Sequence, residues 1–230
     1  MRRFVAPAIF QDRIGVSLSI RLIQITDESV DTFALSWDSR SMYEFVRFAP
    51  LDITPFNDPG MENRSGPPLT RGSLFMLLGT VAGEALGPDA HAVIRRLDVD
   101  SWYQGQLLET LLNMLEEHDP ELPEFVGRNI YFMFRTPLQQ VGINTATDLV
   151  KSMTGTWVFA TRGDSGEFRS RMIADRHWIV EGEQPYNCLF EGGALRGFIE
   201  AFDGHDVKIE HLTCRRKGDP FCTYDVRWEE

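Results

Sequence analysis

Residues 210–228, EHLTCRRKGDPFCTYDVRW, predict two antiparallel strands joined by a tight turn. The turn is expected at Gly218 and Asp219, because Gly-Asp is a dipeptide typical of turns. Two of the chain's three cysteines, Cys214 and Cys222, flank it. With the turn centred on Gly218 they would form a cross-strand pair, whose Cβ atoms usually lie about 4.5–5.5 Å apart. Both thiolates would then reach one metal ion.

Two further side chains are candidates for completing such a site. Cys188 precedes a predicted helix over residues 191–202, after which the chain can return to the same corner. His211 lies three residues before Cys214, so it faces the same way only if a β-bulge lies between them. Glu210 is on the correct face without a bulge and is the alternative ligand. Zinc takes four such ligands. The spacing of Cys214 and Cys222 is not that of a zinc knuckle, however, and the alternative is that the cysteines are buried free thiols.

The middle of the chain is predicted to be helical, over residues 71–153. Apolar side chains at helical spacing predict a first helix with a break at the Gly-Pro dipeptide: Leu74, Leu77, Leu78 and Val81, then Gly87 and Pro88. Ser101 and Gln104 fit a capping box, the start of a second helix. Its apolar face is expected to be Leu108, Leu111, Leu112 and Leu115. A short helix is expected in the sequence TATDLVKSM.

Strands are expected on both sides of this helical region. Residues 1–45 alternate like strands, and residues 48–70 read as a long loop rich in Pro, Gly and Asn. From residue 154 onward the pattern returns to strands, with a hairpin turn at the GDSG of residues 163–166. Helices followed by strands predict an α+β fold, a helical bundle packed on an antiparallel sheet, with a small amino-terminal β subdomain.

Glycines spaced by four occur in two predicted helices. They are Gly79, Gly83 and Gly87 in the first, and Gly193 and Gly197 in the last. No dinucleotide fingerprint surrounds them, so nucleotide binding is not expected. We expect them to permit close helix packing, and a pocket wall is the alternative.

Composition excludes several functions. The net charge of −11 lacks the basic footprint of a nucleic-acid binder, and the basic run from Arg215 to Lys217 reads as a solvated turn. No stretch approaches the roughly 18 apolar residues that span a bilayer, and no secretion signal is visible. We therefore expect a cytoplasmic protein without membrane contact, in which disulfides are uncommon.

The carboxy-terminal residues from Cys188 onward resemble the 4-vinyl reductase domain, found in photosynthetic-pigment proteins and in sensor modules of aromatic-responsive transcription activators. The resemblance lies in a Cys before a Gly-rich helix, then a strand with Val207 and Ile209, and then KGDPFC ending at Cys222. Three cysteines and an acidic residue bind zinc in some members. The resemblance thus implies structural zinc at Cys188, Cys214 and Cys222. The acidic position falls on His211, with Glu210 beside it, so the fourth ligand stays open.

The likeness extends more weakly upstream, into a superfamily that includes haem nitric-oxide-binding domains and transport-protein-particle subunits. It divides the chain into residues 1–69, a β-rich segment and loop, and residues 70–230, a ligand-binding domain similar to the 4-vinyl reductase domain. It also implies a homodimer. None of the five histidines sits in the signature of the haem-binding relatives, so haem is not expected.

The expected function is a non-enzymatic sensory or regulatory module that binds a small apolar or aromatic molecule. The resemblance places a pocket between helices and sheet, and Trp157 and Phe132 are the candidate ligand-binding residues; no catalytic residue is assigned. No output domain is recognisable, so signalling needs a protein partner that the sequence does not identify. A vinyl reductase or pigment-biosynthesis accessory protein and a transport-particle-like scaffold remain the alternatives.

Overall fold

Four antiparallel strands form the main sheet, in the order β4 (Phe168–Ala174), β5 (His177–Gly182), β7 (Cys222–Glu229) and β6 (His205–Thr213). The computed structural model describes residues 46–229. The strands predicted within residues 1–45, and with them the amino-terminal β subdomain, lie outside the described residues. β6 and β7 are the two predicted final strands, so this part of the prediction is confirmed.

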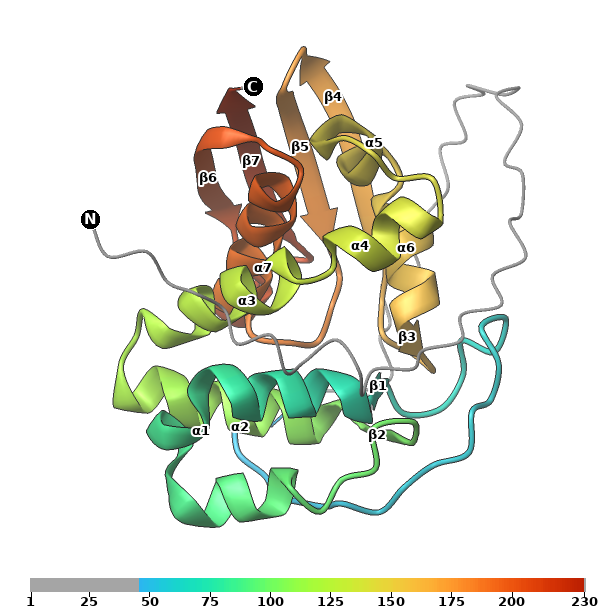
Figure 1. The fold of residues 1–230 in the computed structure, drawn as a ribbon, viewed down its shortest axis with the longest axis vertical. Coiled ribbons are helices and arrows are strands. Elements are labelled where there is room, and N and C mark those ends of the chain that lie inside the picture. The colour runs from blue at the N-terminus through green and yellow to red at the C-terminus, as the bar shows by residue number, and fades with distance from the viewer. Residues whose placement is uncertain (1–45, 230) are drawn as a thin grey trace. The chain divides into compact units, whose positions relative to one another are not determined.

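Seven helices accompany this sheet in the described part of the chain, and α1 and α2 lie beyond one end of it (Figure 1). They are α1 (Gly72–Ile94), α2 (Gly105–His118), α3 (Leu122–Phe132), α4 (Arg135–Gln140), α5 (Ala146–Lys151), α6 (Met153–Ala160) and α7 (Cys188–Ala201). A second, three-stranded sheet has the order β2 (Trp102–Gln104), β1 (Leu69–Arg71), β3 (Thr161–Arg162). The fold is α+β, with helices packed on antiparallel sheet, as predicted.

Helix α7 is the layer between the main sheet and α3. Alternate residues of β7, Cys222, Tyr224, Val226 and Trp228, are buried. On the other side, α7 approaches α3 closely through two glycines. A Cβ on Gly193 would lie 2.1 Å from the backbone oxygen of Glu124, and one on Gly197 would lie 2.1 Å from that of Arg128. The predicted role of this glycine pair in close helix packing is confirmed.

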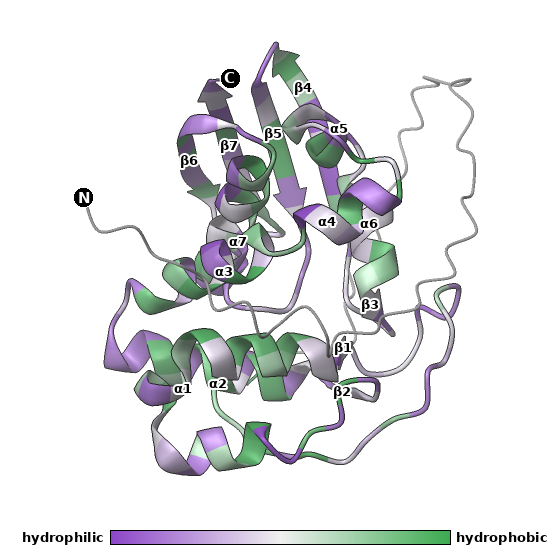
Figure 2. Ribbon diagram, in the orientation of Figure 1, coloured by the Kyte–Doolittle hydropathy of each residue, from purple (hydrophilic) through white to green (hydrophobic). Residues whose placement is uncertain are grey.

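Helix α1 is two helical segments that fold back on each other. Gly87 has φ of +80°, which a residue with a side chain rarely adopts, and the helix turns there as predicted. A Cβ on Gly79 would meet Ile94, and one on Gly83 would meet His91. The buried stripe of α1 is Phe75, Leu78, Ala82 and Leu86. Of the predicted stripe only Leu78 is fully buried, and apolar residues extend around much of this helix (Figure 2).

Three local predictions are wrong. Ser101 and Gln104 form no capping box, because residues 102–104 pair with β1 and α2 begins only at Gly105. The predicted leucine face of α2 is nevertheless buried. Residues 154–160 are helical rather than extended, because the Trp157 ring packs against Phe168 and Tyr186. The GDSG sequence connects strands of two different sheets and so is not a hairpin turn.

Residues 46–68 contain no helix and no strand longer than a single bridge, which agrees with the predicted long loop. The loop is held down by Arg162, whose guanidinium donates to both carboxylate oxygens of Asp58 and stacks 4.3 Å from the ring centroid of Trp102. In the part of the chain that is described, the helices are too short or too polar to cross a membrane.

Candidate metal centre

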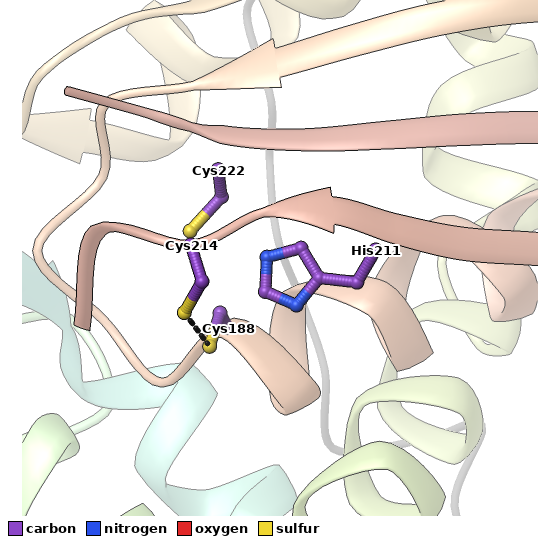
Figure 3. A group of neighbouring side chains, drawn as sticks. All are labelled: Cys188, His211, Cys214 and Cys222. Atoms are coloured by element: carbon purple, nitrogen blue, oxygen red, sulfur yellow. Dashed lines mark hydrogen bonds between the residues drawn. The ribbon is translucent and has the colours of Figure 1, made fainter. Parts of the chain in front are cut away.

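Three cysteines and one histidine converge at one corner of the main sheet (Figure 3). We call Cys188, His211, Cys214 and Cys222 the thiol–imidazole cluster. One ligand atom from each residue lies within 4.8 Å of the other three, and the Sγ atoms of Cys188 and Cys214 are 3.5 Å apart. The three cysteines are only 5%, 6% and 1% exposed. The four side chains chosen from the sequence are therefore brought together.

The four side chains reach this corner from β7, from α7, and from β6 with the residue that directly follows it. Cys222 begins β7, opposite Gly182 of β5, and Cys188 begins α7. Cys214 directly follows β6. The register of β6 against β7 shifts between His211 and Thr213, which is the bulge that the sequence argument required. Because of this bulge His211 joins the cluster, and the alternative ligand Glu210 stays exposed.

The turn between Cys214 and Cys222 is anchored on both sides. It is a 3₁₀ turn, Arg215–Lys217, closed by Gly218 with φ of +99°. The Cys214 N–H donates to Asp219 over 2.7 Å. Arg215 donates to the backbone oxygens of Glu183 and Gln184. The prediction of a solvated turn is thus wrong for Arg215. Arg216 also has protein partners, since it donates to Glu116 and Asn113.

His211 is oriented by an aromatic neighbour. Its ring stacks on Tyr224, with ring centroids 4.7 Å apart and an interplanar angle of 14°. Its Nε2 is buried and finds no hydrogen-bond partner among the described residues. A buried polar atom without a partner is uncommon and costs about 1–3 kcal/mol. The imidazole therefore brings a buried nitrogen without a partner to the thiol–imidazole cluster.

The thiols differ in acidity. Hydrogen bonding with Cys222, together with burial, raises the pKa of Cys188 well above that of an ordinary thiol. The same hydrogen bond lowers the pKa of Cys222, so Cys222 is the first of the pair to become a thiolate. Burial, with the nearby Cys188, raises the pKa of Cys214. Since a metal binds thiolates, binding here would release protons and would weaken as the pH falls.

The two predicted ligand-binding residues lie in different surroundings. Trp157 is 8% exposed, and its indole N–H donates to the Gly166 oxygen over 3.0 Å. Phe132, at the end of α3, is 52% exposed. Neither lines a groove of about 450 Å³ that lies along residues 79–85 of α1, His91 and Leu122. Their role in ligand binding stays a prediction.

A buried polar network beside the cluster was not predicted. Asn113 of α2 is fully buried, and its carboxamide oxygen accepts from Asn187 and Arg216. Glu116, one turn further along, also accepts from both of these residues. Asn187 in addition caps α7 by accepting from the N–H groups of Leu189 and Phe190. Asn is a preferred N-cap residue, but the predicted helix began at residue 191, three residues after the observed start at Cys188, so this signal was not used.

Comparisons with known proteins show the fold and no family. No known family matches this chain, and no curated protein is recognisably similar to it in sequence. The fold resembles a mutant H-NOX domain from Shewanella oneidensis in the Fe(II)CO ligation state, with TM-score 0.54, 16% identity, and coverage of 70% of this chain and 99% of that one. An Fe(II) unliganded H-NOX protein from K. algicida gives TM-score 0.54, 11% identity and coverage of 70% and 97%.

A third structure, an oxygen-binding H-NOX domain related to soluble guanylate cyclases, gives TM-score 0.50, 12% identity and coverage of 69% and 93%. The predicted likeness to haem nitric-oxide-binding domains is thus confirmed at the level of the fold. The 4-vinyl reductase resemblance is matched by none of these comparisons. The prediction of zinc as the structural cofactor is wrong, because the neighbours with this fold are haem iron proteins.

The histidines of this chain are not placed as axial ligands of haem. Haem iron needs an axial ligand that faces a pocket. The Cδ2 and Nε2 atoms of His91, the histidine in the α1 groove, lie 3.1 Å from the Cβ position of Gly83 and so face the helix. His177 contacts Asp225, His211 belongs to the cluster, and His118 and His205 are exposed. The expected absence of haem stays a prediction, and no step below involves haem.

Proposed function

We propose that this chain is a non-enzymatic sensory or regulatory module whose responsive element is a metal ion held by the thiol–imidazole cluster. The observation that carries the proposal is the unsatisfied Nε2 of His211, buried beside three thiols. A single ion would satisfy this nitrogen and the three sulfurs together. Sulfur and imidazole ligands select soft or borderline metal ions, and elemental analysis must identify which one.

The proposed site is closed to catalysis. Four protein ligands fill a tetrahedral shell and leave no open position for a substrate or an activated water. Cys188, Cys214 and Cys222 come from three separate elements, so an ion would tie α7 to the strands β6 and β7. Such an ion stabilises one arrangement of these elements, which is what a regulatory module requires.

Binding of a small apolar molecule is the second part of the proposal. The α1 groove supports it by size, because its volume of about 450 Å³ falls in the range of ligand sites. Its lining combines apolar Val81, Ala85 and Leu122 with polar Thr80, Glu84 and His91. The homodimer and the protein partner for output stay predictions. No observation favours the vinyl reductase or the scaffold alternative.

The test is metal analysis of the full chain under reducing conditions. We expect one metal ion per chain, or one Co(II) bound per chain with the absorption of tetrahedral thiolate-bound cobalt. Cys222→Ala should lose at least nine tenths of this metal while its circular dichroism stays that of a folded protein. If the wild-type chain holds no metal and takes up no Co(II), the cysteines are core thiols and the proposal fails.

A further inference from the structure

The polar face of α2 holds a short irregular stretch of backbone, residues 46–49. This face consists of Gln106, Thr110, Asn113 and Glu116. Gln106 donates to the Val46 oxygen over 2.6 Å, and Asn113 donates to the Arg47 oxygen over 2.6 Å. The Ala49 N–H donates to Thr110 over 3.2 Å. Residues 46–49 are thus bound mainly through their backbone, by side chains of one helix.

The same α2 side chains hold the metal-binding loops from the other side. Asn187 directly precedes Cys188, and Arg216 lies two residues after Cys214. Asn187 donates to Glu116 over 2.7 Å, and Arg216 donates to Glu116 over 2.8 Å. Asn113 and Glu116 are therefore shared between the thiol–imidazole cluster and residues 46–49.

The charges in this network favour the docked arrangement, in which Arg47 and Arg216 both contact Glu116. Glu116 carries ion pairs to Arg216 at 2.8 Å and to Arg47 at 3.5 Å. Burial alone would raise the pKa of Glu116, but the hydrogen bonds from Arg216 and Asn187 hold it below the usual value. Glu116 is thus ionised at neutral pH and attracts one arginine from each side. If Arg216 moved away, Glu116 would be held less firmly. It would then be a weaker and more mobile partner for Arg47.

We propose that metal binding at the thiol–imidazole cluster controls whether residues 46–49 stay docked on α2, with Asn113 and Glu116 transmitting the change. With the ion bound, Cys188 and Cys214 are fixed, and Asn187 and Arg216 beside them stay on Glu116. Without it, the turn after Cys214 is held by fewer bonds, and the docked segment loses its shared anchors. The output of the module is then release of residues 46–49 from α2. This inference rests on the proposed metal site.

Hydrogen exchange of the full chain, read by mass spectrometry, tests the inference. Metal-loaded and metal-free samples are compared, with Co(II) as the probe metal and circular dichroism as the check on folding. We expect protection of the Ala49 N–H and its neighbours to fall at least tenfold on metal removal. By reciprocity, a variant that undocks the segment should weaken Co(II) binding by the same factor.

Glu116→Gln is the diagnostic variant, because it weakens both ion pairs on the shared carboxylate. Glu117→Gln is the matched control, since Glu117 is the next residue of α2 and is exposed. With Co(II) bound, we expect exposure of residues 46–49 in Glu116→Gln and none in Glu117→Gln. Arg47→Ala gives a second test that leaves the metal-binding loops untouched, and it should also weaken Co(II) binding.

The outcomes separate the two proposals. If Co(II) binds one per chain but protection of residues 46–49 is the same with and without it, the coupling is wrong and the metal site stands. If Glu116→Gln and Glu117→Gln behave alike, the shared carboxylate is not the link and the inference is overturned. If no metal binds, the proposed function fails and the inference fails with it.

Discussion

His211 and Tyr224 stack almost parallel across two neighbouring strands, with 4.7 Å between ring centroids. The Tyr224 hydroxyl also donates to the backbone oxygen of Cys188 over 2.9 Å. One tyrosine thus orients the imidazole and holds the start of α7, which carries a thiol. Support of this kind is typical of the residues around metal ligands, whose loss usually lowers metal affinity 10- to 100-fold.

Replacing the histidine tests its role as the fourth ligand. We expect His211→Ala to weaken Co(II) binding by more than tenfold and to change the cobalt spectrum, because one nitrogen ligand is lost. His205→Ala is the matched control, since His205 lies on the same strand but is exposed. Competition titrations against a chelator measure both affinities. Equal affinities in the two variants would remove His211 from the site.

Tyr224→Phe separates orientation from ligation. All four ligands remain in this variant, so one Co(II) should still bind per chain with an unchanged spectrum. The affinity should fall by about tenfold, because the hydrogen bond to Cys188 is lost. The same chelator competition measures it. An affinity equal to that of the wild-type chain would show that the tyrosine is only a packing residue.

The contact between α3 and α7 depends on glycine at specific positions. Gly193→Ala would place a Cβ 2.1 Å from the backbone oxygen of Glu124, so the helices must move apart. We expect a loss of about 1–3 kcal/mol or more in the free energy of unfolding, measured by urea denaturation. Gly192→Ala is the control, because its Cβ would meet only the Tyr224 ring at 3.6 Å. That variant should be unchanged or slightly more stable, since Ala favours helix.

The final hairpin and the three members of the thiol–imidazole cluster that it carries were predictable because their signals are local. Cys214, Gly218 and Cys222 lie within one turn, and His211 needed only a bulge in the adjoining strand. The helix at residues 153–160 was not predictable in this way. Its threonines, tryptophan and phenylalanine favour strands, and packing of Trp157 on residues elsewhere in the chain overrides that preference.

The polar network escaped prediction for a related reason. Asn113 and Glu116 find their partners at Asn187 and Arg216, which are about seventy to a hundred residues away along the chain. No spacing rule connects such positions. The three-residue strands β1 and β2 are similarly short, and pairing of distant segments, rather than their own composition, makes them strands.

Haem should not form a defined complex with this chain, although its structural neighbours are haem proteins. The ring of His91 faces Gly83, and the other described histidines have different partners or are exposed. Spectroscopic titration with haem should therefore show no saturation at one haem per chain. A stoichiometric complex whose absorption changes in His91→Ala would contradict this and would reassign the α1 groove.

Stability should fall between weakly acidic and neutral pH because of Glu109. This side chain is 5% exposed, and burial raises its pKa from 4.5 to about 7, against the opposing effects of Asn113 and Arg216. Between these two pH values the folded chain holds a proton that the unfolded chain has released. The free energy of unfolding therefore decreases as the pH rises from 4.5 to about 7, and this contribution changes little above that.

Glu109→Gln removes the Glu109 part of this pH dependence, because glutamine stays neutral while keeping an oxygen to accept from Asn113. The part due to Glu191 remains, since burial raises the pKa of that carboxyl from 4.5 to about 8. The variant and the parent should have similar stability at pH 5, and the variant should be more stable at pH 8 by about 1–3 kcal/mol. Urea denaturation at both pH values measures the difference. Glu117→Gln, exposed on the same helix, should keep the pH dependence of the parent. If the loss of stability between pH 5 and pH 8 is as large in Glu109→Gln as in the parent, the Glu109 carboxyl is already ionised at pH 5 and its burial does not govern its titration.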